Sequence, residues 1–316
     1  YGCMKKILLL TPALWMTIAI QAQTASEVML QTGADTLYGT LEIPAAEKNI
    51  PVALIIAGSG PTDRNGNNPM MTNNAYQMIA DSLKHHGIAS LRYDKRGIGK
   101  SQPAGAKESD LRFEHYIDDA AAWIQLLQKD PRFSSVTVLG HSEGSLIGML
   151  AAAKAGADAF ISVAGAGESA DKILKRQLAK QAPQFADTCN IIIDSLKAGH
   201  TVTVVNPVLY GLFRPSVQPY TISWFRYDPS AEIARLAIPV LIIQGTTDLQ
   251  VSTADAAMLA KAQEKAQLKI ISGMNHVLKD APDDMQQNFA TYSNPGLSLN
   301  HELITTVTGF ILSLKK

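Results

Sequence analysis

A serine between two glycines carries the clearest chemical signal in this sequence. Residues 140–144 read Gly-His-Ser-Glu-Gly, after an apolar run at 136–139 and before a helix-forming stretch at 145–152. This pattern predicts a strand, a sharp turn and a helix, with Ser142 at the apex of the turn. Such a turn exposes the serine oxygen, and the glycines let neighbouring backbone approach closely. Because a serine hydroxyl is a poor nucleophile near neutral pH, it needs an adjacent base.

Two later loops carry the partners that a serine nucleophile requires. Asp248 follows an apolar run at 239–244, and His276 follows another at 268–271. Loops at the carboxyl ends of parallel strands share one edge of the sheet, so Ser142, Asp248 and His276 are expected to meet there. His276 would take the proton of Ser142 and return it to the leaving group, while Asp248 would orient the imidazole.

Three other aspartates compete with Asp248 for the role of the acid. Asp94 follows a different strand, whereas Asp283 and Asp284 come after the histidine. We therefore expect Asp248 to be the acid.

The chain order serine, aspartate, histidine resembles that of the α/β-hydrolase superfamily, and the likeness covers nearly the whole chain after residue 22. More closely, the sequence is similar to the bacterial esterase and S33/S9-type branch of serine hydrolases. The matching stretches are GSGPTDR at 58–64, DKRGIGKS at 94–101, GHSEG at 140–144, YDP at 227–229, GTTDLQV at 245–251 and MNH at 274–276. The resemblance implies a single α/β-hydrolase domain at 23–316, with a mostly parallel central sheet flanked by helices.

A negatively charged carbonyl oxygen also has to be stabilised during acyl transfer. At least two hydrogen-bond donors are needed where the charge develops. The backbone N–H of Glu143, the residue after the nucleophile, is one expected donor, and the resemblance places the other at the N–H of Ser59. Two possibilities stay open for the Glu143 side chain. It recognises a cationic group such as the free amine of a peptide, or it turns to solvent or to the backbone of a lid.

Strands and helices alternate along most of the chain. Alternating apolar residues predict an antiparallel hairpin at 27–31 and 36–43, and a continuous apolar run predicts a buried parallel strand at 52–57. The other expected strands lie at 88–93, 136–139, 159–164, 239–244 and 268–271. The expected helices lie at 74–86, 113–128, 145–152, 253–263 and 302–314. This alternation indicates a parallel sheet with right-handed crossovers.

An insertion interrupts the alternation between about residues 165 and 237. Helical patterns at 171–181 and 190–196 precede an aromatic tract that several prolines interrupt. We interpret the insertion as a lid over the carboxyl edge of the sheet. Its aromatic residues either line a substrate pocket or form the core of the lid itself. They are Phe213, Tyr220, Trp224 and Phe225.

Composition argues against several classes of protein. Acidic and basic residues balance at 28 each without a basic run, so no nucleic-acid partner is expected. No spacing of histidines or carboxylates suggests a metal. The stretch at 99–101 is similar to the end of a phosphate-binding loop, but the first glycine of that motif is replaced by Asp94. No cofactor is therefore expected.

Residues 1–22 are expected to contain a bacterial signal peptide, with residues 1–3 ahead of a plausible start at Met4. Two lysines precede an uncharged apolar run at 7–20, and small residues around Ala22 suit cleavage. This run is shorter than the roughly 20 residues of a membrane span, so no stable span is expected after cleavage. Cleavage would remove Cys3 and leave Cys189 as the single cysteine, which excludes a disulfide within one mature chain. A periplasmic or secreted protein is predicted.

The first functional hypothesis is hydrolysis of a carboxylic ester with a short acyl group, through an acyl-enzyme and without a cofactor. A small-molecule ester or a short peptide is the expected partner, because the same three residues cleave esters, thioesters and amides. An aminopeptidase-like enzyme or a thioester hydrolase is the alternative within this fold. The alternative of another class is a non-catalytic binding protein on a hydrolase scaffold.

Overall fold

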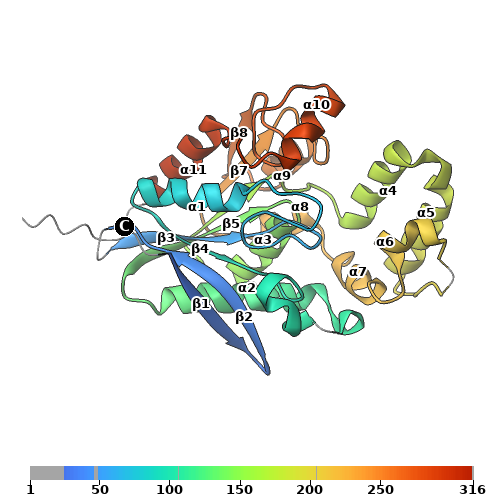
Figure 1. Cartoon of the computed structure of the whole chain (residues 1–316), viewed down its shortest axis with the longest axis horizontal. Coiled ribbons are helices and arrows are strands. Elements are labelled where there is room, and N and C mark those ends of the chain that lie inside the picture. Colours follow the sequence, from blue (N-terminus) through green and yellow to red (C-terminus); the bar gives the residue numbers. More distant parts are fainter. Residues whose placement is uncertain (1–24, 46–48, 106, 204, 315–316) are drawn as a thin grey trace, which may run out of the picture.

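An eight-stranded sheet forms the centre of the molecule (Figure 1). The structure, a computed structural model, describes residues 25–45, 49–105, 107–203 and 205–314, so the predicted signal peptide lies outside the described residues. The strands follow the spatial order β1-β2-β4-β3-β5-β6-β7-β8. They are β1 (Ala25–Thr32), β2 (Asp35–Glu42), β3 (Ile50–Ile56), β4 (Ala89–Tyr93), β5 (Phe133–His141), β6 (Ala159–Val163), β7 (Val240–Gly245) and β8 (Gln267–Ile271).

The sheet is parallel except at one edge. Strand β2 pairs antiparallel with β1 and with β4, and the other neighbouring strands pair parallel. The predicted hairpin is confirmed, because Thr32 pairs with Asp35 across a turn in which Gly33 has a φ of 62°. Glycine adopts this left-handed conformation without steric cost. The mostly parallel α/β sheet expected from the alternation is also confirmed.

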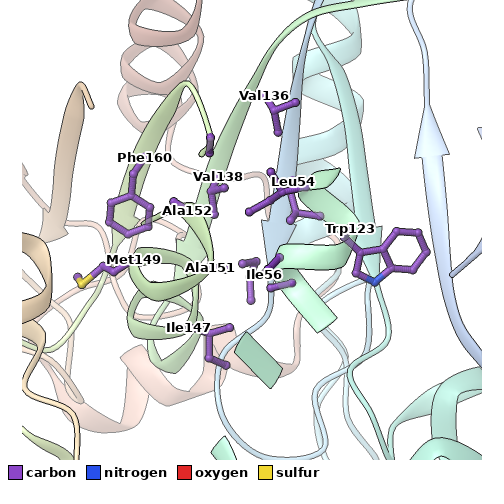
Figure 2. Close-up of a cluster of buried hydrophobic side chains, with 14 of the residues drawn as sticks. Leu54, Ile56, Trp123, Val136, Val138, Ile147, Met149, Ala151, Ala152 and Phe160 are labelled. Carbon is purple, nitrogen blue, oxygen red and sulfur yellow. The ribbon is translucent and has the colours of Figure 1, made fainter. Parts of the chain in front are cut away.

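Helices cover both faces of the sheet. Leu54 and Ile56 of β3 belong to a core that includes α2, α3 and α9, whereas Ala53 and Ile55 belong to a second core with α1 and α11. Figure 2 shows part of the first core, with Trp123 of α2 among its side chains. The helices around the sheet are α1 (Ala75–His85), α2 (Phe113–Gln128), α3 (Glu143–Ala155), α9 (Thr253–Ala262), α10 (Met285–Ala290) and α11 (His301–Ser313). Each buried leucine or isoleucine contributes about 1.5–3 kcal/mol to folding.

A helical insert, defined here as residues 164–239, separates β6 from β7. Its helices are α4 (Ala170–Gln181), α5 (Ala186–Lys197), α6 (Tyr210–Phe213), α7 (Gln218–Trp224) and α8 (Pro229–Ala234). Figure 1 shows α4 to α7 gathered beyond one end of the sheet. Cys189, Phe213 and Phe225 are buried in an apolar core that the insert forms by itself. The predicted insertion is therefore present, and its action as a lid stays a prediction.

Polar contacts attach the insert to α2 and to the segment before it. Arg214 Nε donates a hydrogen bond to Glu108 Oε2 at 2.8 Å. The backbone N–H of Phe113, the first residue of α2, donates to Ser223 Oγ at 2.7 Å. These contacts hold α7 against the start of α2. No helix in the described part of the chain is long and apolar enough to cross a membrane.

Candidate active site

Ser142 forms the whole turn between β5 and α3. Its φ of 54° and ψ of −122° lie in a region that residues with a side chain rarely adopt. Close packing around the turn enforces this conformation. A Cβ atom on Gly140 would lie 2.2 Å from the carbonyl oxygen of Gly144, and one on Gly144 would lie 2.4 Å from the carbonyl oxygen of Ile56. The two glycines therefore allow the close backbone approach that the sequence pattern predicts.

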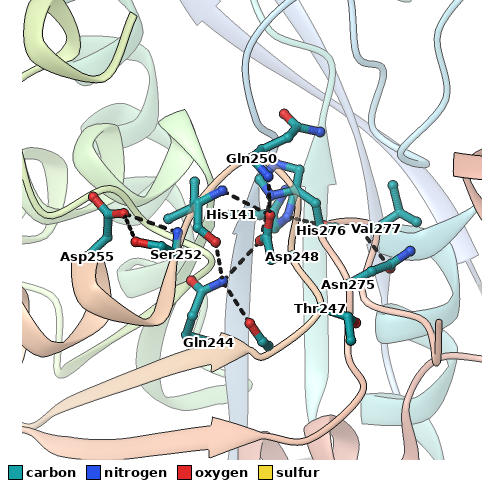
Figure 3. A network of polar contacts seen from close by, with 12 residues as sticks. His141, Gln244, Thr247, Asp248, Gln250, Ser252, Asp255, Asn275, His276 and Val277 are labelled. Atoms are coloured by element: carbon teal, nitrogen blue, oxygen red, sulfur yellow. Dashed lines mark hydrogen bonds and ion pairs between the residues drawn. The ribbon is translucent and has the colours of Figure 1, made fainter. Parts of the chain in front are cut away.

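Asp248 and His276 meet at the carboxyl ends of β7 and β8. The Nδ1 atom of His276 lies 2.8 Å from Asp248 Oδ2, and both side chains are buried. Gln244 Nε2 donates to the same carboxylate oxygen at 3.0 Å. Asp248 Oδ1 accepts the backbone N–H groups of Gln250 and Val251 at 2.8 and 2.9 Å. Figure 3 shows this network, in which donors surround the carboxylate.

The charge of Asp248 decides which nitrogen of His276 carries the proton. Burial by itself raises the pKa of Asp248, but the facing His276 and the hydrogen bonds from His276 and the backbone outweigh burial, so the pKa is lowered. An ionised carboxylate only accepts hydrogen bonds, so Nδ1 of His276 donates to it. In a neutral imidazole, Nε2 then keeps its lone pair and can accept a proton.

Ser142 and His276 line the same cavity, which has a volume of about 230 Å³ and also reaches Ser59. No hydrogen bond joins Ser142 Oγ to His276 among the described contacts. A second cavity of about 110 Å³ is lined by Ser59, Ser142 and Glu143. The two cavities share Ser142 and Ser59, so Ser142 and His276 line adjoining cavities.

Two backbone donors without partners lie beside Ser142. Within the described part of the chain, neither the N–H of Ser59 nor the N–H of Glu143 donates a hydrogen bond to another protein group. Both residues line the 110 Å³ cavity together with Ser142. Buried or partly buried N–H groups are normally paired, so these two groups are available to an oxygen atom in the cavity.

A chain of hydrogen bonds connects the loop of Ser59 to the loop of His276. The backbone N–H of Gly58 donates to Tyr76 Oη at 3.0 Å, and Tyr76 Oη lies 2.8 Å from His141 Nδ1. His141 Nε2 lies 2.8 Å from the carbonyl oxygen of His276. Since a carbonyl oxygen only accepts, Nε2 of His141 carries a proton, and Nδ1 of the neutral ring accepts the proton of Tyr76. Every donor in this series of hydrogen bonds therefore has an acceptor when His141 is neutral.

Protonation of His141 would disrupt this chain, because Nδ1 would then face the hydroxyl of Tyr76 as a second donor. Burial, and after it the neighbouring His276, lower the pKa of His141 from 6.5 to about 3. The unfolded chain binds a proton at His141 below about pH 6.5, whereas the folded chain does not until about pH 3. As the pH falls through this window, the unfolded chain gains a proton at His141 that the folded chain does not. The free energy of unfolding therefore decreases.

Replacement of His141 by glutamine is expected to make the stability of the protein less dependent on pH. Between about pH 5.5 and 4.5, the free energy of unfolding of the wild type should fall by roughly 1.4 kcal/mol more than that of His141→Gln, which corresponds to one proton. Urea denaturation of both proteins at the two pH values measures the difference. Equal pH dependence would show that His141 is protonated in the folded state.

The Glu143 side chain has a partner that the sequence did not suggest, although Glu143 also lines the 110 Å³ cavity. It is buried, and its Oε1 lies 3.3 Å from Lys95 Nζ, an ammonium that is also buried. The nearby hydroxyl of Tyr220 has a pKa raised well above its usual value by burial, and further by the charge of Glu143. The carboxylate therefore faces an internal cation rather than solvent or lid backbone, because Lys95 compensates its buried charge.

Two of the competing aspartates have other partners, and the third is exposed. Asp94 accepts hydrogen bonds from the backbone N–H and the guanidinium of Arg64, at 2.9 and 2.7 Å. Asp284 accepts the backbone N–H of Gln287 at the start of α10, and Asp283 is exposed. The structure therefore brings Asp248, and not its three competitors, to His276.

Sequence reasoning missed Tyr76, Lys95 and Gln244, each of which contacts the loops of the site. Phe213 and Phe225 belong to the core of the insert, whereas Trp224 and Tyr220 also line cavities beside Ser59 and Glu143. The described residues contain no group of three or more His, Cys, Asp or Glu side chains that could hold a metal ion.

Comparisons with known proteins place these features in context. The model of the family described as "Serine aminopeptidase, S33" matches residues 70–205. Esterase EstD of Thermotoga maritima is 28% identical over 252 residues, which cover 77% of this chain and 58% of the esterase. The chain therefore spans little more than half the length of that relative. Human monoglyceride lipase is 25% identical over 266 residues, which cover 74% of this chain and 78% of the lipase.

Solved structures show the same fold at lower sequence identity. Est1E from Butyrivibrio proteoclasticus superposes with a TM-score of 0.59 at 18% identity, over 92% of this chain and 99% of Est1E. At this level of identity the likeness concerns the fold alone. The likeness agrees with the parallel sheet and flanking helices described above.

Proposed function

Because the chain belongs to the α/β-hydrolase superfamily, we propose that it hydrolyses carboxylic esters through an acyl-enzyme on Ser142. One observation carries the proposal. Ser142 and His276 line cavities that share Ser142 and Ser59, and the residues with the unpartnered N–H groups, Ser59 and Glu143, line them as well. The family model and the two curated relatives, an esterase and a lipase, support this reaction class.

The reaction begins when Ser142 Oγ attacks the carbonyl carbon of the ester. His276 Nε2 takes the proton of the hydroxyl and later gives it to the alcohol that leaves. A water molecule then repeats the attack on the acyl-enzyme, with His276 again as the base. Proton transfer requires Oγ and Nε2 to come within about 2.6–3.2 Å of each other, a contact that often tightens only when substrate binds.

The two backbone N–H groups stabilise the tetrahedral intermediate. The oxygen of the attacked carbonyl becomes negatively charged, and the donors of Ser59 and Glu143 are already oriented before the charge appears. Loss of one such donor typically costs roughly 10²–10³-fold in rate. Asp248 stays ionised and stabilises the imidazolium that forms on His276.

Cavity sizes support a short acyl group. The cavity that holds Ser142 and both donors has a volume of about 110 Å³, well below the roughly 300–1,000 Å³ of sites for drug-sized ligands. A larger cavity of about 680 Å³ adjoins it at Ser59 and Glu143 and is lined by Tyr220 and Leu212 of the insert. The larger cavity can take the alcohol part of the ester.

The peptidase alternative is less favoured because of the surroundings of Glu143. A carboxylate that binds the free amine of a peptide has to be available to that amine. The carboxylate of Glu143 is instead buried against Lys95 Nζ, 3.3 Å away. The charge of Glu143 is therefore already compensated before any substrate amine arrives.

A substrate series tests the proposal against both alternatives. We expect kcat/KM for p-nitrophenyl butyrate to exceed that for the decanoate ester by roughly tenfold or more, since a longer chain exceeds the small cavity. Alanine p-nitroanilide should not be hydrolysed. Comparable kcat/KM values for the anilide and the butyrate would favour the peptidase. A folded protein that hydrolyses no ester and does not react with a fluorophosphonate would favour the binding protein.

Export to the periplasm or the medium is part of the proposal. It is supported by the lysines and the apolar run at 7–20, which have the pattern of a signal peptide. Fractionation of cells that express the full chain, followed by N-terminal sequencing of the mature protein, tests it.

A further inference from the structure

A buried lysine next to the candidate site has no role in the reaction described above. Lys95 follows β4 and is only 3% exposed. Its Nζ atom donates a hydrogen bond to the carbonyl oxygen of Gly58, lies 3.3 Å from Glu143 Oε1 and sits 5.7 Å from the ring centroid of Tyr116. A buried ammonium is costly without partners, and each of these three contacts compensates its charge.

The contact with Gly58 determines the direction of the next N–H group. The carbonyl of Gly58 and the N–H of Ser59 belong to one peptide unit, which is planar and trans, so they point in opposite directions. Lys95 occupies the carbonyl side of this peptide. The N–H of Ser59 therefore points away from Lys95, and Ser59 lines the same cavity as Ser142.

The peptide unit before Gly58 is held as well. The N–H of Gly58 donates to Tyr76 Oη at 3.0 Å. A Cβ atom on Gly58 would lie 3.2 Å from the Cβ of Ser142, so the loop packs directly against the nucleophile. Tyr76 and Lys95 thus fix both polar groups of Gly58, and only the N–H of Ser59 is left without a protein partner.

We propose that Lys95 is a positioning residue, which holds the peptide between Gly58 and Ser59 so that the Ser59 N–H points at the oxyanion. The inference rests on the proposed function, because the oxyanion forms only during acyl transfer. Lys95 also forms a salt bridge with Glu143. It ties Lys95 to the residue that supplies the other N–H group, so one ammonium contacts Glu143 and the peptide unit to which the Ser59 N–H belongs.

Removal of Lys95 alone would leave the buried charge of Glu143 without a partner, and the protein could lose stability for that reason. Two proteins lack this charge: Glu143→Gln, which keeps the side-chain shape and the backbone N–H and leaves Lys95 with the Gly58 carbonyl and the Tyr116 ring, and the double variant Lys95→Met/Glu143→Gln. The comparison between them measures the effect of Lys95 alone. Thermal unfolding followed by circular dichroism verifies that both proteins fold.

The double variant is expected to have a kcat for p-nitrophenyl butyrate roughly 10- to 100-fold below that of Glu143→Gln, with KM within about threefold. The inhibition constant of an alkyl trifluoromethyl ketone should rise by a similar factor, because its adduct with Ser142 places an oxyanion in the same position. Equal kcat values and equal inhibition constants in the two proteins would overturn the proposal.

Lys84→Met is the matched control. Lys84 Nζ also pairs with a buried carboxylate, that of Glu42 at 2.8 Å, and neither Lys84 nor Glu42 lines the cavities of Ser142. This variant should lose stability and keep its kcat within about twofold of the wild type. If Lys84→Met lowers kcat as much as the loss of Lys95 does, a general effect of buried ion pairs explains both results and the proposal fails.

A crystal structure of the double variant separates this inference from the proposed function. We expect the peptide between Gly58 and Ser59 to have turned, with the Ser59 N–H no longer directed at the cavity. An unchanged peptide would overturn the role of Lys95 whatever the protein hydrolyses. Absence of Ser142-dependent turnover in the wild type would instead refute the proposed function, and the structure would still decide the role of Lys95.

Discussion

Replacement of Ser142 by alanine is expected to lower kcat for p-nitrophenyl butyrate by roughly 10⁴- to 10⁶-fold. The loss is this large because the acyl-enzyme cannot form without Oγ, and His276 and the two N–H groups then act only on water. Residual catalysis by the remaining groups sets the lower limit. Binding of a non-reactive competitive inhibitor should change little, because alanine removes one atom from the cavity. Steady-state kinetics and labelling with a fluorophosphonate measure the effect.

Ser145→Ala is the matched control for this experiment. Ser145 lies in the first turn of α3, close to Ser142 in sequence, but its Oγ contacts Ser162 Oγ at 2.7 Å in the interior. This variant should still be labelled by the fluorophosphonate. Labelling that survives in Ser142→Ala, or is lost in Ser145→Ala with the fold intact, would contradict the assignment of the nucleophile.

The helices and strands around the sheet can be predicted from local sequence patterns, because buried apolar residues recur with the periodicity of a helix or of a strand. The predicted helix at 113–128 coincides with α2. The strand predicted at 52–57 corresponds to β3, and its ends differ from those of β3 by one or two residues. The insert is different. Helix α5 begins at Ala186, although the pattern predicted only 190–196, since its buried face packs against other parts of the insert. A local pattern does not reveal a partner of that kind.

The direction of the Glu143 side chain also depends on a distant partner. Lys95 is 48 residues away along the chain, and only the tertiary fold brings its ammonium to the carboxylate. Sequence reasoning therefore left two orientations open and did not include the pairing with Lys95. The negative charge of Glu143 does not by itself predict where its side chain points, because a carboxylate next to a nucleophile can bind a substrate or stabilise the fold.

Gln244 did carry a signal that sequence reasoning did not use. It is the only strongly polar residue in the otherwise apolar strand β7, and a buried amide in such a strand has to find hydrogen-bond partners. Its Nε2 donates to Asp248 Oδ2 and to the carbonyl oxygen of Val251, both at 3.0 Å. A polar residue at the end of a buried strand thus pointed to Asp248 in the loop that follows.

Asp248→Asn is expected to lower kcat by roughly 10³- to 10⁴-fold while KM stays within a few-fold of its wild-type value. Asparagine has nearly the same shape, so the reason lies in its hydrogen bonds. In the wild type, four donors converge on the carboxylate: Gln244 Nε2, His276 Nδ1 and the backbone N–H groups of Gln250 and Val251. An amide offers an oxygen on one side only.

Either orientation of the asparagine amide opposes donors. With its NH₂ group toward His276, it faces Nδ1 with a donor, so the imidazole proton moves to Nε2 and the base is lost. With its NH₂ group toward Gln250 and Val251, it opposes two backbone N–H groups and the loop has to shift. Asp283→Asn, at an exposed competitor of the same type, is the matched control and should keep full activity. A wild-type kcat in Asp248→Asn would mean that another group orients His276, and the role assigned to Asp248 would be wrong.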